Sequence, residues 1–234
     1  MPEQQTAWGV PVADASPAVR AEFIRKTYLH LGGAVLAFIG LEALLLSSPL
    51  AEPLVRSALG TRFGWLVVLG AFMLVGWVAQ RWASSPTSVP MQYLGLGLYV
   101  VAEAIIFVPL MFVAANMAGP KVIPEAGIYT VLVFAGLTGT VFLTRRDFSW
   151  LRGALTIGAF AALGVIVASI LFGFTLGSVF TILMVVLAAG YILYYTSNVL
   201  HHYPVGSHVA ASLALFSAVA LLFWYILRLL SSRR

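Results

Sequence analysis

Seven long apolar runs occupy most of this chain and restrict its fold more than any other feature. A helix needs about 20 apolar residues to cross the hydrocarbon core of a bilayer, and each run approaches or exceeds that length. Backbone groups in lipid must be hydrogen-bonded within the protein, which leaves helices or closed barrels, and the runs lack the alternation of barrel strands. We therefore predict an all-α, polytopic membrane protein with seven transmembrane helices in one bundle. The predicted spans are 28–48, 63–82, 93–115, 126–144, 153–173, 175–198 and 207–230.

The low charge content agrees with this interpretation. Only 9% of the residues are charged, whereas soluble domains contain about 25%, so lipid must cover most of the surface. We divide the chain into a polar N-terminal tail (1–27), a transmembrane domain (28–230) and a basic C-terminal tail (231–234). The N-terminal tail is expected to be mostly disordered, with 17–27 as a candidate interfacial helix. The short segment 172–176 predicts either a tight hairpin or a re-entrant helix.

Basic residues near the helix ends predict the orientation of the bundle. The two sides are nearly balanced, at seven against six, but the early segments usually dominate and favour a cytoplasmic N-terminus and an outside C-terminus. The thin spread of these residues also argues against a nucleic-acid partner. The N-terminal side carries Arg20, Arg25, Lys26, Arg81, Arg145, Arg146 and Arg152, and the opposite side carries Arg56, Arg62, Lys121, Arg228, Arg233 and Arg234.

Two acids lie within the predicted spans, Glu42 in the first and Glu103 in the third. A charge at mid-bilayer costs roughly 2.5–3.5 kcal/mol, so such residues usually face the bundle interior. Glu103 lies near the middle of its span and six residues before Pro109, which should kink the helix. Each acid is either part of a proton or cation path or a protonated group that is hydrogen-bonded to a neighbouring helix. Glu42 lies nearer a helix end and is the weaker candidate.

Polar residues cluster at the predicted cytoplasmic ends of the later helices. The loop that contains Arg145, Arg146 and Asp147 suits anionic headgroups, and Asp147 and Ser149 are expected to cap the following helix. His201, His202 and His208 flank the last connection, where they are either pH sensors or ordinary interfacial residues. Adjacent histidines without an acid do not match the usual spacing of a zinc site, so no metal site is predicted.

Small residues predict close helix packing at two places. Gly95 and Gly97, and Gly136 and Gly139, are expected to let neighbouring helices approach closely.

The sequence lacks the motifs of the common enzyme classes. It has no Cys, no Lys within a span, and neither a zinc-protease pair nor a nucleophile elbow. We therefore expect neither an enzyme nor a cofactor.

Three segments resemble the Bax inhibitor-1 family, in its bacterial YccA-like branch. They are YVVAEAIIFVPLMFVA at 99–114, FLTRRDFSWLRGAL at 142–155 and AAGYILYYTSNVLHHY at 188–203. The resemblance extends from about residue 23 to 230. It implies seven helices with the last one central, a location in the inner membrane, and either a pH-sensitive calcium leak or a role in membrane-protein quality control and stress survival.

The resemblance also implies two gating aspartates that this chain lacks. The sixth-helix position holds Tyr195, within Tyr194-Tyr195-Thr196, and the seventh-helix position matches near Phe216. A tyrosine has a reference pKa near 10 and cannot replace a carboxylate as a Ca²⁺ ligand. The aspartate pH sensor of the family therefore does not transfer to this sequence.

Two functions remain. The first is a cation leak, with calcium as the transported ion and with Glu103 and Glu42 in its path. The alternative is a non-conducting regulator in the lipid bilayer that binds a membrane protein, such as a quality-control protease.

Overall fold

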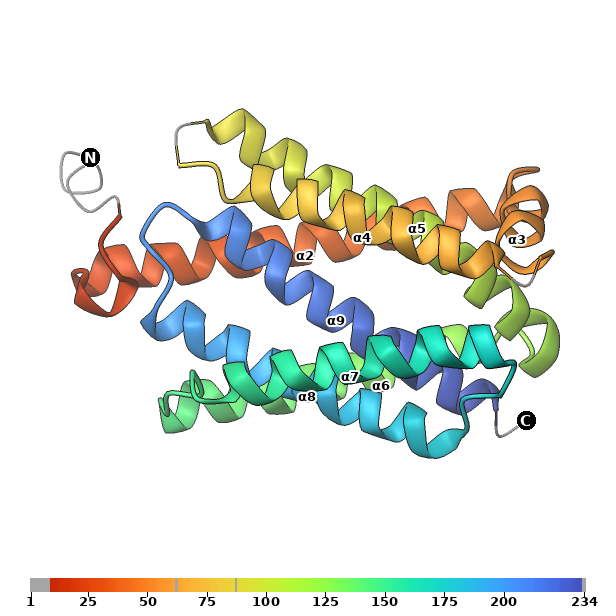
Figure 1. Cartoon of the computed structure of the whole chain (residues 1–234). Helices are drawn as coiled ribbons and strands as arrows, with labels where there is room; N and C mark the ends of the chain where they lie inside the picture. The colour runs from red at the N-terminus through yellow and green to blue at the C-terminus, as the bar shows by residue number, and fades with distance from the viewer. Residues whose placement is uncertain (1–8, 62, 87, 233–234) are drawn as a thin grey trace.

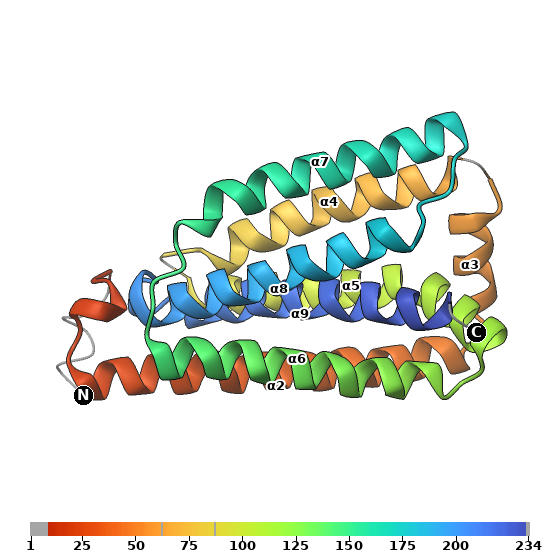
Figure 2. The same ribbon diagram turned by 90° about the horizontal axis from the view of Figure 1, so that it is seen from below.

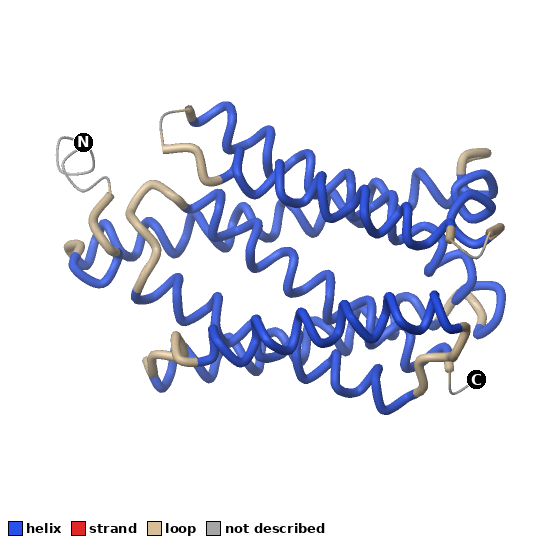
Figure 3. The backbone as a smooth tube through the Cα atoms, in the orientation of Figure 1, coloured by secondary structure: helices blue, strands red, loops and turns tan. Residues whose placement is uncertain are grey.

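The computed structural model describes residues 9–61, 63–86 and 88–232, which form eight α-helices and one short 3-10 helix (Figure 1). The connections between them are short (Figure 3). Seven of the helices are long and apolar enough to cross a membrane, which confirms the predicted all-helical class. In chain order the elements are η1 (Val12–Asp14), α2 (Pro17–Ser47), α3 (Ala51–Leu59), α4 (Gly64–Ala83), α5 (Val89–Ala118), α6 (Val122–Thr144), α7 (Leu151–Phe172), α8 (Ser178–His201) and α9 (His208–Ser231).

The long helices form three layers. Figure 2 shows α5, α8 and α9 in the middle, with α2 and α6 on one side and α4 and α7 on the other. The described parts of the two chain ends lie at opposite ends of the bundle, as an odd number of crossings requires (Figure 1). The loops α4–α5, α6–α7 and α8–α9 gather at the N-terminal end of this bundle.

Helix α9 is the centre of the bundle. In its most apolar window 78% of the residues are buried, against 11–50% for the other spans. A helix that is apolar all round belongs in the interior, and the run from Val209 to Phe216 is entirely buried here. The central position implied for the last helix by the family resemblance is therefore observed.

Local sequence explains where several helices begin and end. The Ser88 hydroxyl accepts a hydrogen bond from the Met91 backbone N–H (3.3 Å) and caps α5, with proline in the first turn. Gly173, at φ 80°, closes α7 in the left-handed conformation that glycine adopts most easily. Only four further residues precede α8, so this connection is a tight hairpin and the re-entrant alternative is wrong.

The segment before the first span is more ordered than the sequence predicts. Helix α2 begins at Pro17, so residues 17–27 continue the first span and do not form a separate interfacial helix. The Val12 backbone N–H donates to the Tyr203 carbonyl (2.9 Å), and the Val205 N–H donates to the Val10 carbonyl (2.9 Å). The expectation of disorder is therefore wrong for residues 9–16, while residues 1–8 lie outside the described part.

Two other features differ from the sequence-based expectations. The short helix α3 lies between the first two spans, where no helix was predicted. Helix α7 has Trp150 at its N-cap without a side-chain hydrogen bond, so Asp147 and Ser149 do not cap it. Asp147 instead accepts a hydrogen bond from the Ser149 backbone N–H (2.8 Å), which is a local turn inside the loop.

Candidate functional site

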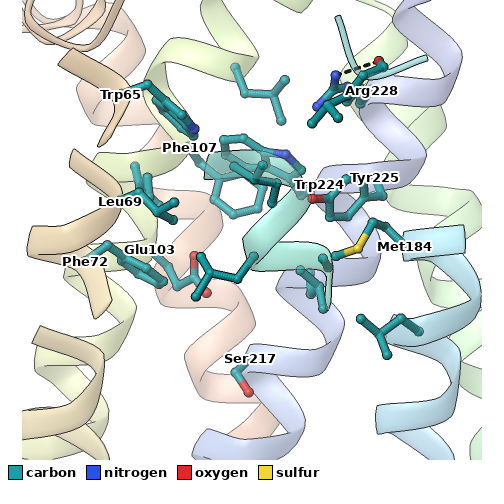
Figure 4. A pocket seen from close by; sticks show the side chains of 18 of the residues that line it. Trp65, Leu69, Phe72, Glu103, Phe107, Met184, Ser217, Trp224, Tyr225 and Arg228 are labelled. Atoms are coloured by element: carbon teal, nitrogen blue, oxygen red, sulfur yellow. Dashed lines mark hydrogen bonds between the residues drawn. The ribbon is translucent and has the colours of Figure 1, made fainter. Parts of the chain in front are cut away.

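A cavity of about 760 Å³ lies between α4 on one side and α7 and α8 on the other (Figure 4). Helices α5 and α9 supply its remaining walls, and it is open to the surroundings of the protein. Binding sites in helical bundles are commonly built between facing helices. The cavity is therefore the candidate functional site.

Glu103 is the only acid among the described residues that line this cavity. It projects from α5, is 6% exposed, and lies between Phe72 and Ser217 in Figure 4. The Tyr99 hydroxyl lies within hydrogen-bonding reach of both the Glu103 carboxyl and Ser217. Three oxygen-bearing side chains from α5 and α9 thus meet at one wall of an otherwise mainly apolar space.

Glu42, the other predicted membrane acid, belongs to the neighbouring helix α2. It is only 4% exposed, so it lies inside the bundle although it is close to a helix end. Its carboxyl group interacts electrostatically with that of Glu103, and neither of its oxygens has a hydrogen-bond partner within the described part of the chain. Glu42 does not line the cavity itself. The fold therefore brings the two predicted acids together across α2 and α5.

The two substituted family positions have different surroundings. Tyr195 of α8 lines the cavity and packs on Tyr191, with ring centroids 5.7 Å apart. Phe216 of α9 is 2% exposed and packs edge-on against Tyr99 at 6.1 Å and Phe38 at 6.0 Å. The first position thus presents a phenol to the cavity, and the second has become part of the apolar core.

Aromatic rings form a shelf across the cavity beyond Glu103 (Figure 4). The Trp224 ring stacks on Trp65 at 5.6 Å and meets Phe107 edge-on at 4.8 Å. Phe107 also stacks on Phe223 at 5.7 Å with nearly parallel planes. Such ring pairs add about 0.5–1.5 kcal/mol each to the burial of their area. This shelf joins α4, α5 and α9.

Arg228 lies at the far end of the cavity, in the last turn of α9. Its guanidinium donates a hydrogen bond to the Leu176 carbonyl (3.1 Å) and is half-buried. Among residues 9–61, 63–86 and 88–232, no carboxylate forms a salt bridge with it. Its position in the sequence indicated only a charge near a helix end, so its place in the cavity was not foreseen.

The predicted histidines do not form one cluster. His202 donates to the Asp147 carboxylate (2.9 Å), whereas the ring of His201 contacts the Ser197 carbonyl of its own helix (3.0 Å). His208 packs against His30, with ring centroids 5.0 Å apart. His30, which was not singled out from the sequence, also bonds Tyr93 (2.9 Å). Within the described residues no group of three His, Cys, Asp or Glu side chains could hold a metal ion.

Asp147 joins the α6–α7 loop to the end of α8. Its carboxylate accepts hydrogen bonds from the Ser197 hydroxyl (3.2 Å) and from His202, and the Ser197 oxygen accepts one from the Phe148 backbone N–H (2.9 Å). Partial burial acts to raise the pKa of Asp147, but hydrogen bonds from Ser149 and His202 outweigh it and lower the pKa to about 2. Arg145 ends α6 at φ 52°, and both Arg145 and Arg146 remain exposed.

Comparisons with known proteins extend over nearly the whole chain. The family model described as "Inhibitor of apoptosis-promoting Bax1" matches residues 20–234. Similar proteins include Bax inhibitor 1 of Schizosaccharomyces pombe, 26% identical over 94% of this chain and 80% of the relative, and Protein LIFEGUARD 4 of Arabidopsis thaliana, 28% identical over 93% and 87%. An uncharacterized protein of Pseudomonas aeruginosa is 33% identical over 47% of this chain and 50% of its own length. With its seven spans and central last helix, the chain belongs to the Bax inhibitor-1 family of multi-pass membrane proteins.

Proposed function

We propose that this protein is a cation leak pathway, with calcium as the transported ion, and that the path passes Glu103. The observation that carries the proposal is the buried carboxyl on the wall of a cavity inside a membrane bundle. Calcium prefers several oxygen ligands, and Tyr99, Ser217 and Tyr195 supply neutral oxygens in the same cavity. No catalytic step and no cofactor form part of this proposal.

A pH response of this path would depend on the two glutamates and not on the aspartates of the family. Positions 195 and 216 hold Tyr and Phe, so the chain has no carboxyl at either family position. Glu42 and Glu103 are the acids within the bundle whose charges interact, and Tyr99 is the titratable group beside Glu103. We propose an inner-membrane location, as the resemblance to the bacterial branch of the family implies, and a cytoplasmic N-terminus, which the early basic residues favour.

The test is calcium flux into liposomes that contain the purified protein, measured at about pH 6 and about pH 8. The parent protein should exceed empty liposomes, and Glu103→Gln should lower the flux on the order of tenfold, because one charged partner of the ion is lost. Glu52→Gln is the matched control, since it removes a carboxyl from α3 whose side chain is 73% exposed. Its flux should equal that of the parent.

If folded protein shows no calcium flux at either pH value, the proposed leak pathway is wrong. The alternative is then a non-conducting regulator that binds a membrane protein, which is favoured by the replacement of both family aspartates by aromatic residues. Cross-linking in membranes, with and without residues 1–8, would test this alternative. If the same partners are found in both samples, residues 1–8 take no part in binding them.

A further inference from the structure

The cavity is elongated along one face of α9. Ser217, Leu221, Trp224 and Arg228 all line it, and they are spaced four, three and four residues apart. This spacing places them on one side of a helix, and eleven residues correspond to about 16 Å along the axis. Figure 4 shows the same order, with Ser217 at one end, the aromatic shelf in the middle and Arg228 at the other end.

The walls of this elongated cavity are mostly apolar side chains, and α4 and α7 supply part of them. Leu69 and Phe72 line it from α4, and Ala159, Leu163 and Ile166 line it from α7. Protein interiors are packed to the density of organic crystals, so an open cavity of about 760 Å³ leaves room for a ligand. Lipid acyl chains are the apolar material that surrounds membrane-spanning helices, and they match the mainly apolar lining.

Arg228 is the residue at the cavity that could favour one lipid headgroup over another. Movement of a chain from lipid to an apolar protein wall gives no hydrophobic gain, because lipid tails are as apolar as leucine. Selection must therefore come from the polar end of the ligand. Among the described residues that line the cavity, Arg228 is the only cation, and no described carboxylate forms a salt bridge with it. Thr175 supplies a hydroxyl to the same lining. A guanidinium binds phosphate through two parallel hydrogen bonds.

We propose that the cavity is a binding site for an anionic glycerophospholipid. One acyl chain lies in the cavity between α4 and α7 and covers the aromatic shelf, and the phosphate binds Arg228. The lipid occupies the Arg228 end, whereas Glu103 lies beyond the shelf (Figure 4). The inference does not depend on cation conduction.

Quenching of tryptophan fluorescence by lipids brominated on the acyl chain tests this site. Trp224 lies on the cavity wall, so the difference between the parent and Trp224→Phe isolates its emission. In mixed vesicles, brominated phosphatidylglycerol should quench this emission at a mole fraction about fivefold lower than brominated phosphatidylcholine does, as expected for one arginine–headgroup contact. Equal quenching by the two lipids in the parent protein would overturn the proposal without any further variant.

Two matched pairs of variants locate the site. Arg228→Gln should abolish the preference for phosphatidylglycerol, whereas Arg56→Gln, which removes an exposed charge from α3 at the same end of the bundle, should retain it. Ser169→Phe fills the cavity from the end of α7 that lies nearest Arg228 and should reduce quenching by both lipids, whereas Ala161→Phe, on the exposed face of α7, should not. A preference that survives Arg228→Gln, or quenching that survives Ser169→Phe, would overturn the proposal. Calcium flux is measured separately, so failure of the lipid site and failure of the leak pathway are distinguishable.

Discussion

Single residues acquire their roles here from partners far away in the sequence. Asp147 and His202 are 55 positions apart, yet their side chains are 2.9 Å apart and join the α6–α7 loop to the end of α8. The fully buried Ser197 hydroxyl donates a second hydrogen bond to Asp147. The sequence marks these residues as polar groups at helix ends, and nothing in its periodicity pairs them.

The lowered pKa of Asp147 predicts how this junction depends on pH. A carboxyl whose pKa is lower in the folded than in the unfolded state stabilises the fold above its unfolded pKa, and the stabilisation is lost as the pH falls toward its folded pKa. The pKa of Asp147 is lowered from 3.8 to about 2, so the loss should occur between about pH 4 and pH 2. Asp147→Asn should lower the free energy of unfolding at pH 7 by less than about 1 kcal/mol, because the side chain is 44% exposed.

Thermal unfolding in detergent, followed by circular dichroism, measures this difference. The stabilities of the parent and Asp147→Asn should become equal near pH 2. Glu52→Gln serves as a control, because it removes a carboxyl from the Glu52–Arg56 salt bridge, which is far more exposed. Equal stabilities at pH 7 would show that the junction contributes nothing to folding.

At the scale of helix pairs, two helix backbones approach most closely where a glycine replaces a larger side chain. Gly95 of α5 faces the end of α4 so closely that a Cβ atom there would lie 2.4 Å from the Ala83 nitrogen and 2.5 Å from the Ala79 oxygen. The expected close approach is therefore confirmed at Gly95. At Gly97, Gly136 and Gly139 a Cβ atom would meet nothing within 4 Å, so the same expectation is wrong there.

Gly95→Ala should destabilise the α4–α5 pair because two helix backbones would have to separate. We expect a loss of about 1–3 kcal/mol, as for other overpacked sites. Gly97→Ala, on the open side of the same helix, should be neutral or stabilising because alanine forms helices better than glycine. Unfolding in a denaturing detergent compares the two variants, and equal losses would contradict the close contact at Gly95.

In the whole molecule, the first and last described residues lie at opposite ends of the bundle (Figure 1), so the orientation of one loop gives the orientation of all. The chain contains no cysteine, which makes any introduced thiol a unique probe. Ser84 lies in the α4–α5 loop at the N-terminal end, and Ser232 follows α9 at the other end. Both positions are exposed.

With a cytoplasmic N-terminus, right-side-out membrane vesicles should react with a membrane-impermeant maleimide at Ser232→Cys and not at Ser84→Cys. Inside-out vesicles should show the reverse pattern, and permeabilised vesicles should label both variants. Labelling of Ser84→Cys alone in right-side-out vesicles would show that the early basic residues do not set the orientation.

The sequence by itself determined the helical class and the number of spans. Lipid requires every backbone group in a span to find its partner locally, so the length and hydropathy of each run are sufficient evidence. The same local rule could not foresee helix α3, which is only nine residues long, or the pairing of Val12 with Tyr203. These depend on contacts between distant segments.

The candidate site was decided only by the tertiary structure. The sequence identified Glu103 and Glu42 as isolated membrane acids, but their electrostatic interaction depends on how α2 packs against α5. Likewise, the cavity that joins Glu103, Tyr195, the aromatic shelf and Arg228 exists because five helices and their connecting segments leave a space beside α9. Helix formation in lipid depends on neighbouring residues along the chain, whereas a site between helices depends on which side chains the packing brings together.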